Sequence, residues 1–167
     1  IGSEMSGGVR RVTISNCVFE GTDRGIRLKT MRGRGGEIQD LRVSNITMNN
    51  MVREGIMINM RYQPTEPEPV SERTPAINSI QISNINIRGA RQAVAIYGLE
   101  EREASGISFD DIRIFAEKGI VIENASGVTF HNLEMNISEG SPLDARDSKN
   151  ITWDMVTVGS PLKDLPY

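Results

Sequence analysis

A short motif recurs six times along the chain, and it constrains the fold more than any other feature of the sequence. Successive copies start 29, 39, 27, 21 and 23 residues apart. The copies begin at Val12, Leu41, Ile80, Ile107, Val128 and Ile151. The shortest spacings indicate a structural repeat of a little over twenty residues, and the longer ones contain insertions. The longest spacing holds the proline-rich segment 62–69, which cannot form a central strand.

Each copy follows the same pattern. Apolar residues such as Val12 and Ile14 alternate with polar ones, as in a β-strand with one buried face. Asn16 then shifts the alternation by one residue. Because asparagine adopts the left-handed conformation more readily than most residues, we expect a sharp bend there. We also expect the side-chain amides of this column to hydrogen-bond along the stack. The equivalent positions hold Asn45, Asn84, Asp111, Asn132 and Met155.

A second apolar strand follows most copies. These segments are 25–29, 55–59, 93–97, 119–123 and, more weakly, 142–146. Two or three strands in each coil of about twenty residues, stacked in register, predict an all-β fold: a single-stranded parallel β-helix of about six coils, forming one domain over residues 1–167. The excess of 20 Ile and 11 Val over 7 Leu agrees, because branched residues favour strands. A twisted β-sandwich is the alternative, but its hairpins would not repeat at this period.

Composition limits the partners of the chain. A net charge of −3 argues against a protein that binds the phosphates of nucleic acids. The chain contains no run of 18 apolar residues, so the sequence predicts no membrane-spanning helix. Cys17 is the only cysteine and lies with Trp153 in inward columns, so we expect both in the core. His131 is the only histidine and lies at an outward position, and we predict no metal site and no cofactor.

Two cations on one second strand are the first candidates for a site. In segment 25–29 the inward positions are Ile26 and Leu28, so Arg27 and Lys29 project together from the outer face, about 7 Å apart. Such a pair could hold the carboxylate of an acidic sugar. A surface ion pair with Asp23 or Glu4 explains the same residues equally well.

Four segments resemble glycoside hydrolase family 28, the polygalacturonases. Segment 22–30, with glycines at 33, 35 and 36, resembles the Arg-Ile-Lys motif region of the family, with Leu28 in place of the isoleucine. Segment 1–8 resembles the stretch after its His-Gly motif, 55–62 resembles a strand that ends in a substrate-contacting tyrosine, and 74–75 fits as well. The resemblance extends to about position 90. It implies a right-handed parallel β-helix that hydrolyses α-1,4-galacturonosyl linkages of pectin with inversion, and it implies that Arg27, Lys29 and Tyr62 bind the substrate.

The resemblance also implies what this chain lacks. The family places its catalytic aspartates and histidine in Asn-Thr-Asp, Asp-Asp and His-Gly motifs, which would precede residue 1. The pair Asp110-Asp111 occupies a different strand, so we assign no catalytic residue to this chain. We therefore expect the C-terminal half of a secreted or periplasmic pectin hydrolase, lacking N-terminal coils and inactive by itself. Its partner would be an acidic polysaccharide, not a nucleic acid or a membrane, and the exposed N-terminal edge could self-associate.

Two other functions stay open from the sequence. One is a non-catalytic polysaccharide-binding or structural β-helix, such as a tailspike or an adhesin stalk, which would need no cluster of Arg, Lys and Tyr. The other is a pectate lyase β-helix, which would need calcium-binding carboxylates. No such acidic cluster is expected on the face that carries Arg27.

Overall fold

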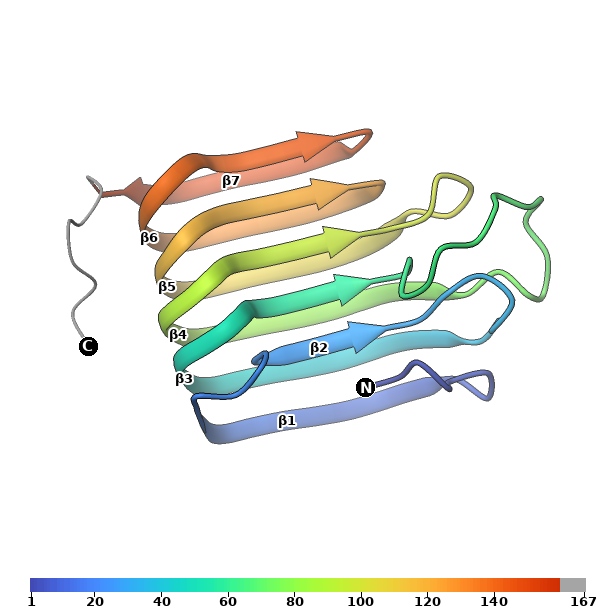
Figure 1. Ribbon diagram of the computed structural model, residues 1–167, viewed down its shortest axis with the longest axis horizontal. Helices are drawn as coiled ribbons and strands as arrows, with labels where there is room; N and C mark the ends of the chain where they lie inside the picture. Colours follow the sequence, from blue (N-terminus) through green and yellow to red (C-terminus); the bar gives the residue numbers. More distant parts are fainter. Residues whose placement is uncertain (160–167) are drawn as a thin grey trace.

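The computed structural model describes residues 1–159, which form strands and connecting loops. The strands are β1 (Val9–Glu20), β2 (Ile26–Lys29), β3 (Glu37–Asn59), β4 (Ala76–Tyr97), β5 (Ala104–Glu123), β6 (Ala125–Arg146) and β7 (Lys149–Val158). Pairing is parallel throughout, in the order β1-β3-β4-β5-β6-β7, and β2 also pairs with β3. The long strands bend, so that each forms two sides of one coil (Figure 1). This arrangement confirms the predicted parallel β-helix. Among the described residues there is no helix with the length and apolar character needed to cross a bilayer.

The six copies of the motif stack in register, as the sequence predicts. Val12 pairs with Leu41, and the same column continues through the first residue of every later copy. In the middle coils the inward side chains are buried, for example Ile46, Ile85 and Leu133. Burying one such side chain contributes about 1.5–3 kcal/mol, so these columns are the main source of stability.

Bends occur where the sequence predicts them. The backbone φ angle lies between 50° and 58° at all six positions of the asparagine column. The amide of Asn45 donates to the side-chain oxygen of Asn16 at 3.1 Å, and that of Asn84 donates to Asn45 at 2.8 Å. Asn132 donates to Asp111. Within the described residues no hydrogen bond joins Asn84 to Asp111, because the aspartate side chain lacks the amide N–H with which the asparagines donate to the preceding coil.

A second column of bends was not predicted. It lies five residues before the asparagine column in every coil, with φ between 54° and 64°. Its members are Arg11, Asp40, Ser79, Gly106, Gly127 and Asn150. Five of the six are Gly, Asn, Asp or Ser, which are common turn residues, so the constant offset could have revealed the column.

The two ends of the stack are less buried than its middle. Cys17 is half-buried because β1 has a neighbouring coil on one side only among the described residues, and its thiol donates to the carbonyl of Ser15 at 3.3 Å. At the other end Trp153 packs on Phe130 with ring centres 5.4 Å apart, and Phe130 stacks on Phe109 at 4.7 Å. Both residues face inward as predicted, but they are only partly buried and pack against the core, because each lies in an end coil of the described stack. Self-association through the β1 edge stays a prediction.

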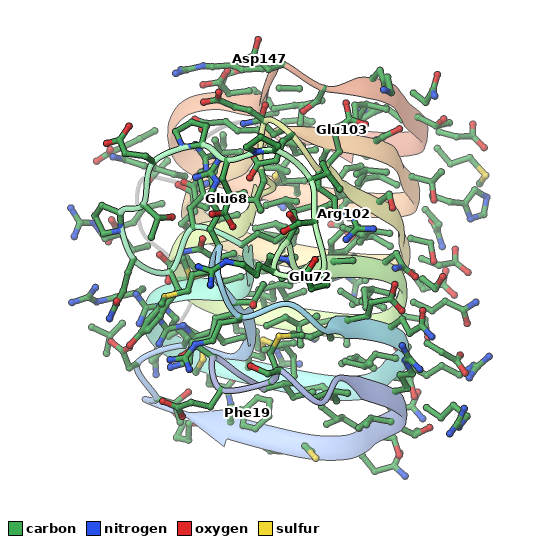
Figure 2. The ribbon with its side chains drawn as sticks, turned by 90° about the vertical axis from the view of Figure 1, so that its right-hand side faces the viewer. Phe19, Glu68, Glu72, Arg102, Glu103 and Asp147 are labelled. Atoms are coloured by element: carbon green, nitrogen blue, oxygen red, sulfur yellow. The ribbon has the colours of Figure 1, made fainter. Side chains whose placement is uncertain are left out.

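Three loops gather at one end of the coils. They are residues 30–36, 60–75 and 98–103, and the proline-rich segment lies outside the strands as predicted. Figure 1 shows them at the right, and Figure 2 looks onto this end, where Glu68 and Glu72 of the second loop and Arg102 of the third are labelled. The outward surface of the second strands lies beside these loops.

The amide column offers a test of what holds each bend. Replacing Asn45 by Ala removes two side-chain hydrogen bonds and leaves, at a φ of 56°, a residue that adopts the left-handed backbone less readily than asparagine does. We expect Asn45→Ala to lower the free energy of unfolding by about 2 kcal/mol and Asn45→Gly by about 1 kcal/mol, because glycine tolerates this φ. Denaturant titration measures both values, with Ser44→Ala as the control. Equal losses for Ala and Gly would contradict a role for the left-handed backbone.

Candidate functional site

The outward side chains of the second strands form two parallel rows, which together we call the outer face. One row is Arg27, Met57, Ala95, Val121 and Asp144; the other is Lys29, Asn59, Tyr97, Glu123 and Arg146. The predicted alignment is therefore confirmed. However, Met57 is only 7% exposed and Ala95 only 1%, so the middle of the first row is largely buried.

The three predicted substrate-binding residues meet at the β2 end of the outer face. The Lys29 ammonium lies 4.3 Å from the centre of the Tyr62 ring, and the Arg27 guanidinium carbon lies 5.5 Å from it. Tyr62 is held there because its backbone N–H donates to the carbonyl of Thr30 at 3.1 Å. On the other side of β2, the N–H of Lys29 donates to the carbonyl of Ile1 at 3.0 Å. The site formed by Arg27, Lys29 and Tyr62 is thus built on a strand with backbone partners on both sides.

Neither cation of this site is neutralised within residues 1–159. No ion pair there includes Arg27 or Lys29, and the Nε–H of Arg27 is buried without a hydrogen-bond acceptor. The two carboxylates considered as partners contact other arginines: Asp23 pairs with Arg24 and Arg53, and Glu4 lies 3.7 Å from Arg34. Two adjacent cations and an unused guanidinium N–H make this a position where an anion can bind.

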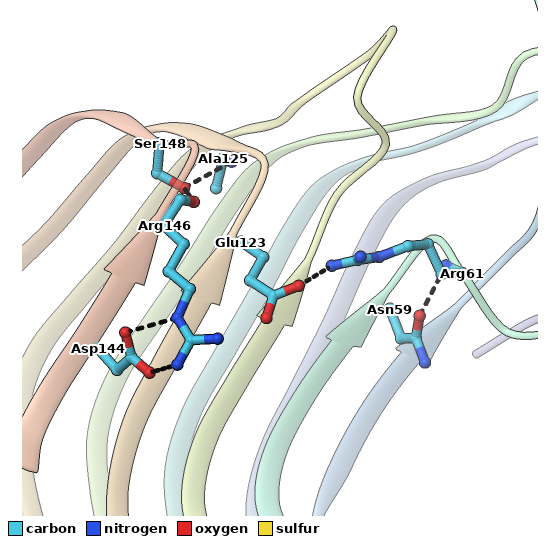
Figure 3. Close-up of polar contacts among 7 residues, drawn as sticks. All are labelled: Asn59, Arg61, Glu123, Ala125, Asp144, Arg146 and Ser148. Atoms are coloured by element: carbon cyan, nitrogen blue, oxygen red, sulfur yellow. Dashed lines mark hydrogen bonds and ion pairs between the residues drawn. The ribbon is translucent and has the colours of Figure 1, made fainter. Parts of the chain in front are cut away.

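Further along the outer face the charges are paired. Arg61 donates to Glu123 at 2.6 Å, and its backbone N–H donates to the Asn59 side chain at 2.6 Å (Figure 3). The Arg61 guanidinium carbon also lies 5.2 Å from the centre of the Tyr97 ring. One coil on, Arg146 grips Asp144 through two hydrogen bonds (Figure 3). Burial, then the nearby negative charges of Glu123 and Glu54, raise the pKa of Tyr97, so its phenol stays protonated and can donate.

Two adjoining shallow clefts lie on the same face. One, of about 470 Å³, runs over β3, β4 and β5, and the other, of about 420 Å³, runs over β4, β5 and β6. They share Gln92, Tyr97 and Lys118. The outer face therefore has a depression next to the site at β2 and in line with it along the stack.

Comparison with known proteins decides the family. A family model for glycosyl hydrolases family 28 matches residues 1–129. This chain belongs to that family. The match extends past position 90, where the visible resemblance of motifs ends.

Fungal polygalacturonases are among the relatives of this family 28 chain. It is 28% identical over 97 residues to endopolygalacturonase 1 of Colletotrichum lindemuthianum, covering 58% of this chain and 27% of that protein. It is 26% identical over 97 residues to a polygalacturonase of Penicillium griseoroseum, covering 58% of this chain and 26% of that protein. It is 36% identical over 67 residues to polygalacturonase 1 of Penicillium olsonii, covering 40% of this chain and 18% of that protein. The chain thus spans about a quarter of the length of the curated relatives it matches.

A group of hydrogen bonds that the sequence did not predict joins the three loops 30–36, 60–75 and 98–103 of the family 28 chain. The guanidinium of Arg32 donates to both oxygens of Glu101, at 2.6 and 2.7 Å, and to the carbonyl of Thr65 at 3.1 Å. Arg102 donates to the carbonyl of Thr74 at 2.8 Å. The Arg32 side chain is only 8% exposed, and its hydrogen bonds hold the pKa of the Glu101 carboxyl below its usual value. These contacts fix the loop that carries Tyr62.

His131 and the aspartates near it lie away from the outer face. His131 is exposed, with Asp110 2.7 Å from Nδ1 and Asp154 3.9 Å from Nε2, and its hydrogen bond to Asp110 raises the pKa of the imidazole. Asp110 and Asp154 hold the same position as His131 in the neighbouring copies of the motif, so the register expected from the sequence places them beside the histidine. Asp111 accepts from Asn132 in the bend column. Within residues 1–159 no group of three or more His, Cys, Asp or Glu is arranged to hold a metal ion.

The Arg32–Glu101 ion pair should make the free energy of unfolding depend on pH. Because the folded-state pKa of Glu101 is lowered, the pair stabilises fully above the ordinary glutamate pKa and loses this effect as pH falls through the lowered value. We expect Arg32→Ala to reduce the free energy of unfolding near neutral pH by about 2–4 kcal/mol, since it leaves Glu101 unpaired. The difference from the parent should shrink in acid. Denaturant titrations at a series of pH values measure it.

The control is Arg113→Ala, which breaks the exposed pair that Arg113 forms with Glu134 at 2.8 Å. An exposed pair contributes about 1 kcal/mol or less. If Arg32→Ala costs no more than this control, or if its cost is the same at every pH, the ion pair does not fix the loops.

Proposed function

We propose that the whole protein is a polygalacturonase-type hydrolase that cleaves α-1,4-galacturonosyl linkages of pectin with inversion, and that this chain supplies the carboxylate-binding side of its cleft. The observation that carries the proposal is the pair of cations Arg27 and Lys29, which make no ion pair within residues 1–159 and lie next to the Tyr62 ring. Membership of family 28 and the polygalacturonase names of the relatives support the choice of substrate.

The chemistry of a galacturonate unit fits these three side chains. Its carboxylate is planar and can accept from the Arg27 fork while Lys29 supplies a compact second charge. The apolar C–H face of the sugar can pack on the Tyr62 ring. Because the strand is rigid and Tyr62 is held by the backbone of Thr30, little conformational entropy is lost on binding.

Bond cleavage in this proposal requires groups outside the sequence given. Inversion needs a general acid and a general base on opposite sides of the scissile bond, with room for water. Asp110 and Asp111 face His131 and Asn132, away from the outer face, and we give them no catalytic role. We propose that residues 1–167 alone bind the polysaccharide without hydrolysing it, and that the whole protein acts outside the cytoplasm, where pectin is met. Release of reducing ends from polygalacturonate by this chain alone would contradict that placement.

Substitution of the two cations tests the substrate. We expect Arg27→Ala and Lys29→Ala each to weaken binding of trigalacturonate to the chain by about tenfold, because each removes a charge-assisted contact. Isothermal titration calorimetry measures the affinity. Arg42→Ala is the matched control, since Arg42 is exposed and lies in β3, where it pairs with Asp40 of the same strand at 3.0 Å.

The methyl-esterified trimer separates charge recognition from sugar recognition. It lacks the carboxylates, so we expect weak binding that neither Arg27→Ala nor Lys29→Ala changes. If both variants bind the acidic trimer with unaltered affinity, Arg27 and Lys29 do not contact the substrate, and the proposed galacturonate site is wrong.

A further inference from the structure

The loop that carries Tyr62 has few contacts with the rest of the chain. All of residues 63–70 except Glu68 are exposed. Within residues 1–159, the only hydrogen bond that reaches this stretch is the one that Arg32 donates to the carbonyl of Thr65, at 3.1 Å. Glu68 pairs with an arginine of the same loop, so this contact does not tie the loop to the rest of the chain. The position of the loop therefore depends strongly on Arg32.

Two anchors hold the stretch from Tyr62 to Thr65. At its start the backbone N–H of Tyr62 donates to the carbonyl of Thr30 at 3.1 Å, and at its end the carbonyl of Thr65 accepts from Arg32. Thr30 and Arg32 are both buried. Pro64 lies between the two anchors, and a proline has a fixed φ and restricts the preceding residue to an extended backbone. The stretch is thus short and stiff, so a displacement at Thr65 also moves Tyr62.

The geometry of Arg32 requires an arginine. Its Nε and Nη2 donate to the two oxygens of Glu101, at 2.6 and 2.7 Å, which leaves Nη1 for the carbonyl of Thr65. The carboxylate of Glu101 therefore fixes the plane of the guanidinium and with it the direction of the third bond. A lysine has a single ammonium on a flexible stem and cannot reproduce a planar fork together with a third contact.

A displacement of this loop would act on the ring of Tyr62. The ring centre lies 4.3 Å from the Lys29 ammonium and 5.5 Å from the guanidinium carbon of Arg27. The attraction between a cation and an aromatic face is lost when the ring moves away. In the proposed function the same ring also packs on the apolar face of the sugar.

We propose that Arg32 is a positioning residue of the galacturonate site, a role that rests on the proposed function for its ligand. Held by Glu101, Arg32 fixes Thr65 and thereby sets the place of the Tyr62 ring over the two cations. It acts on the affinity for an acidic sugar through Tyr62, without touching the ligand.

Arg32→Lys separates positioning from folding. The lysine keeps a positive charge beside Glu101, so the variant stays folded, but it has no third N–H in place for Thr65. We expect Arg32→Lys to weaken binding of trigalacturonate about fivefold, as Tyr62→Ala does. The double variant of Arg32→Lys and Tyr62→Ala should bind no more weakly than Tyr62→Ala alone. Isothermal titration calorimetry measures the affinities, at a temperature well below the unfolding midpoint of every variant.

Hydrogen exchange without ligand tests the anchors themselves. We expect the Tyr62 N–H to exchange about fivefold faster in Arg32→Lys, as measured by NMR, because one of the two anchors is lost. The Met60 N–H, which donates to the carbonyl of Tyr97 at 2.8 Å, should exchange at an unchanged rate. Arg113→Lys is the matched control, since it changes an exposed ion pair between β5 and β6 and should alter neither exchange nor affinity.

The positioning role requires both faster exchange at Tyr62 and a loss of affinity that Tyr62→Ala abolishes, and any other result overturns it. Its failure differs from that of the proposed function. If Arg27→Ala weakens binding of trigalacturonate and Arg32→Lys does not, the proposed function stands and Arg32 is only structural. If the parent chain does not bind trigalacturonate, the proposed function is wrong, and faster exchange in Arg32→Lys would then show only that Arg32 fixes the loop.

Discussion

In-register pairing between successive coils is the constraint on which the rest of this structure depends. Parallel hydrogen bonding places residue on residue from Val12 to Ile151, so an inward position in one coil is inward in all. The left-handed backbone at Asn16 and its equivalents lets each strand turn without losing that alignment. The same alignment stacks the outward side chains of the second strands. A continuous outward surface along the stack is therefore a direct consequence of the fold, and the identity of each outward residue decides its chemical character.

Charge is distributed unevenly along this surface. Arg61 with Glu123, and Arg146 with Asp144, neutralise one another in the later coils. At β2 the cations Arg27 and Lys29 have no such partner within residues 1–159 and share one aromatic ring. Arg32 and Glu101 hold the loop that brings this ring into place. The paired charges thus fix Tyr62 and Tyr97, and Arg27 and Lys29, which make no ion pair within residues 1–159, are the cations that the proposed function assigns to an acidic ligand.

The sequence predicted whatever depends on local pattern. Strand alternation, the bend at Asn16 and the outward pair Arg27 and Lys29 follow from a two-residue period and from one residue type, and all are found in the structure. The resemblance to family 28 added Tyr62, which the period alone could not select. Apart from the second column of bends, the missed features depend on contacts between residues that are far apart in the sequence. Arg32 and Glu101 are 69 residues apart and Arg61 and Glu123 are 62 apart, so no spacing rule pairs them. The sequence pattern also did not show that Met57 and Ala95 are buried although they lie on an outward row.

A crystal structure of this chain with a galacturonate oligomer tests the central claim most directly, because it shows which side chains meet the carboxylates. The account predicts one carboxylate within hydrogen-bonding distance of both the Arg27 guanidinium and the Lys29 ammonium, with its sugar against the Tyr62 ring. An oligomer bound on another face, with Arg27 and Lys29 contacting none of it, would contradict the account.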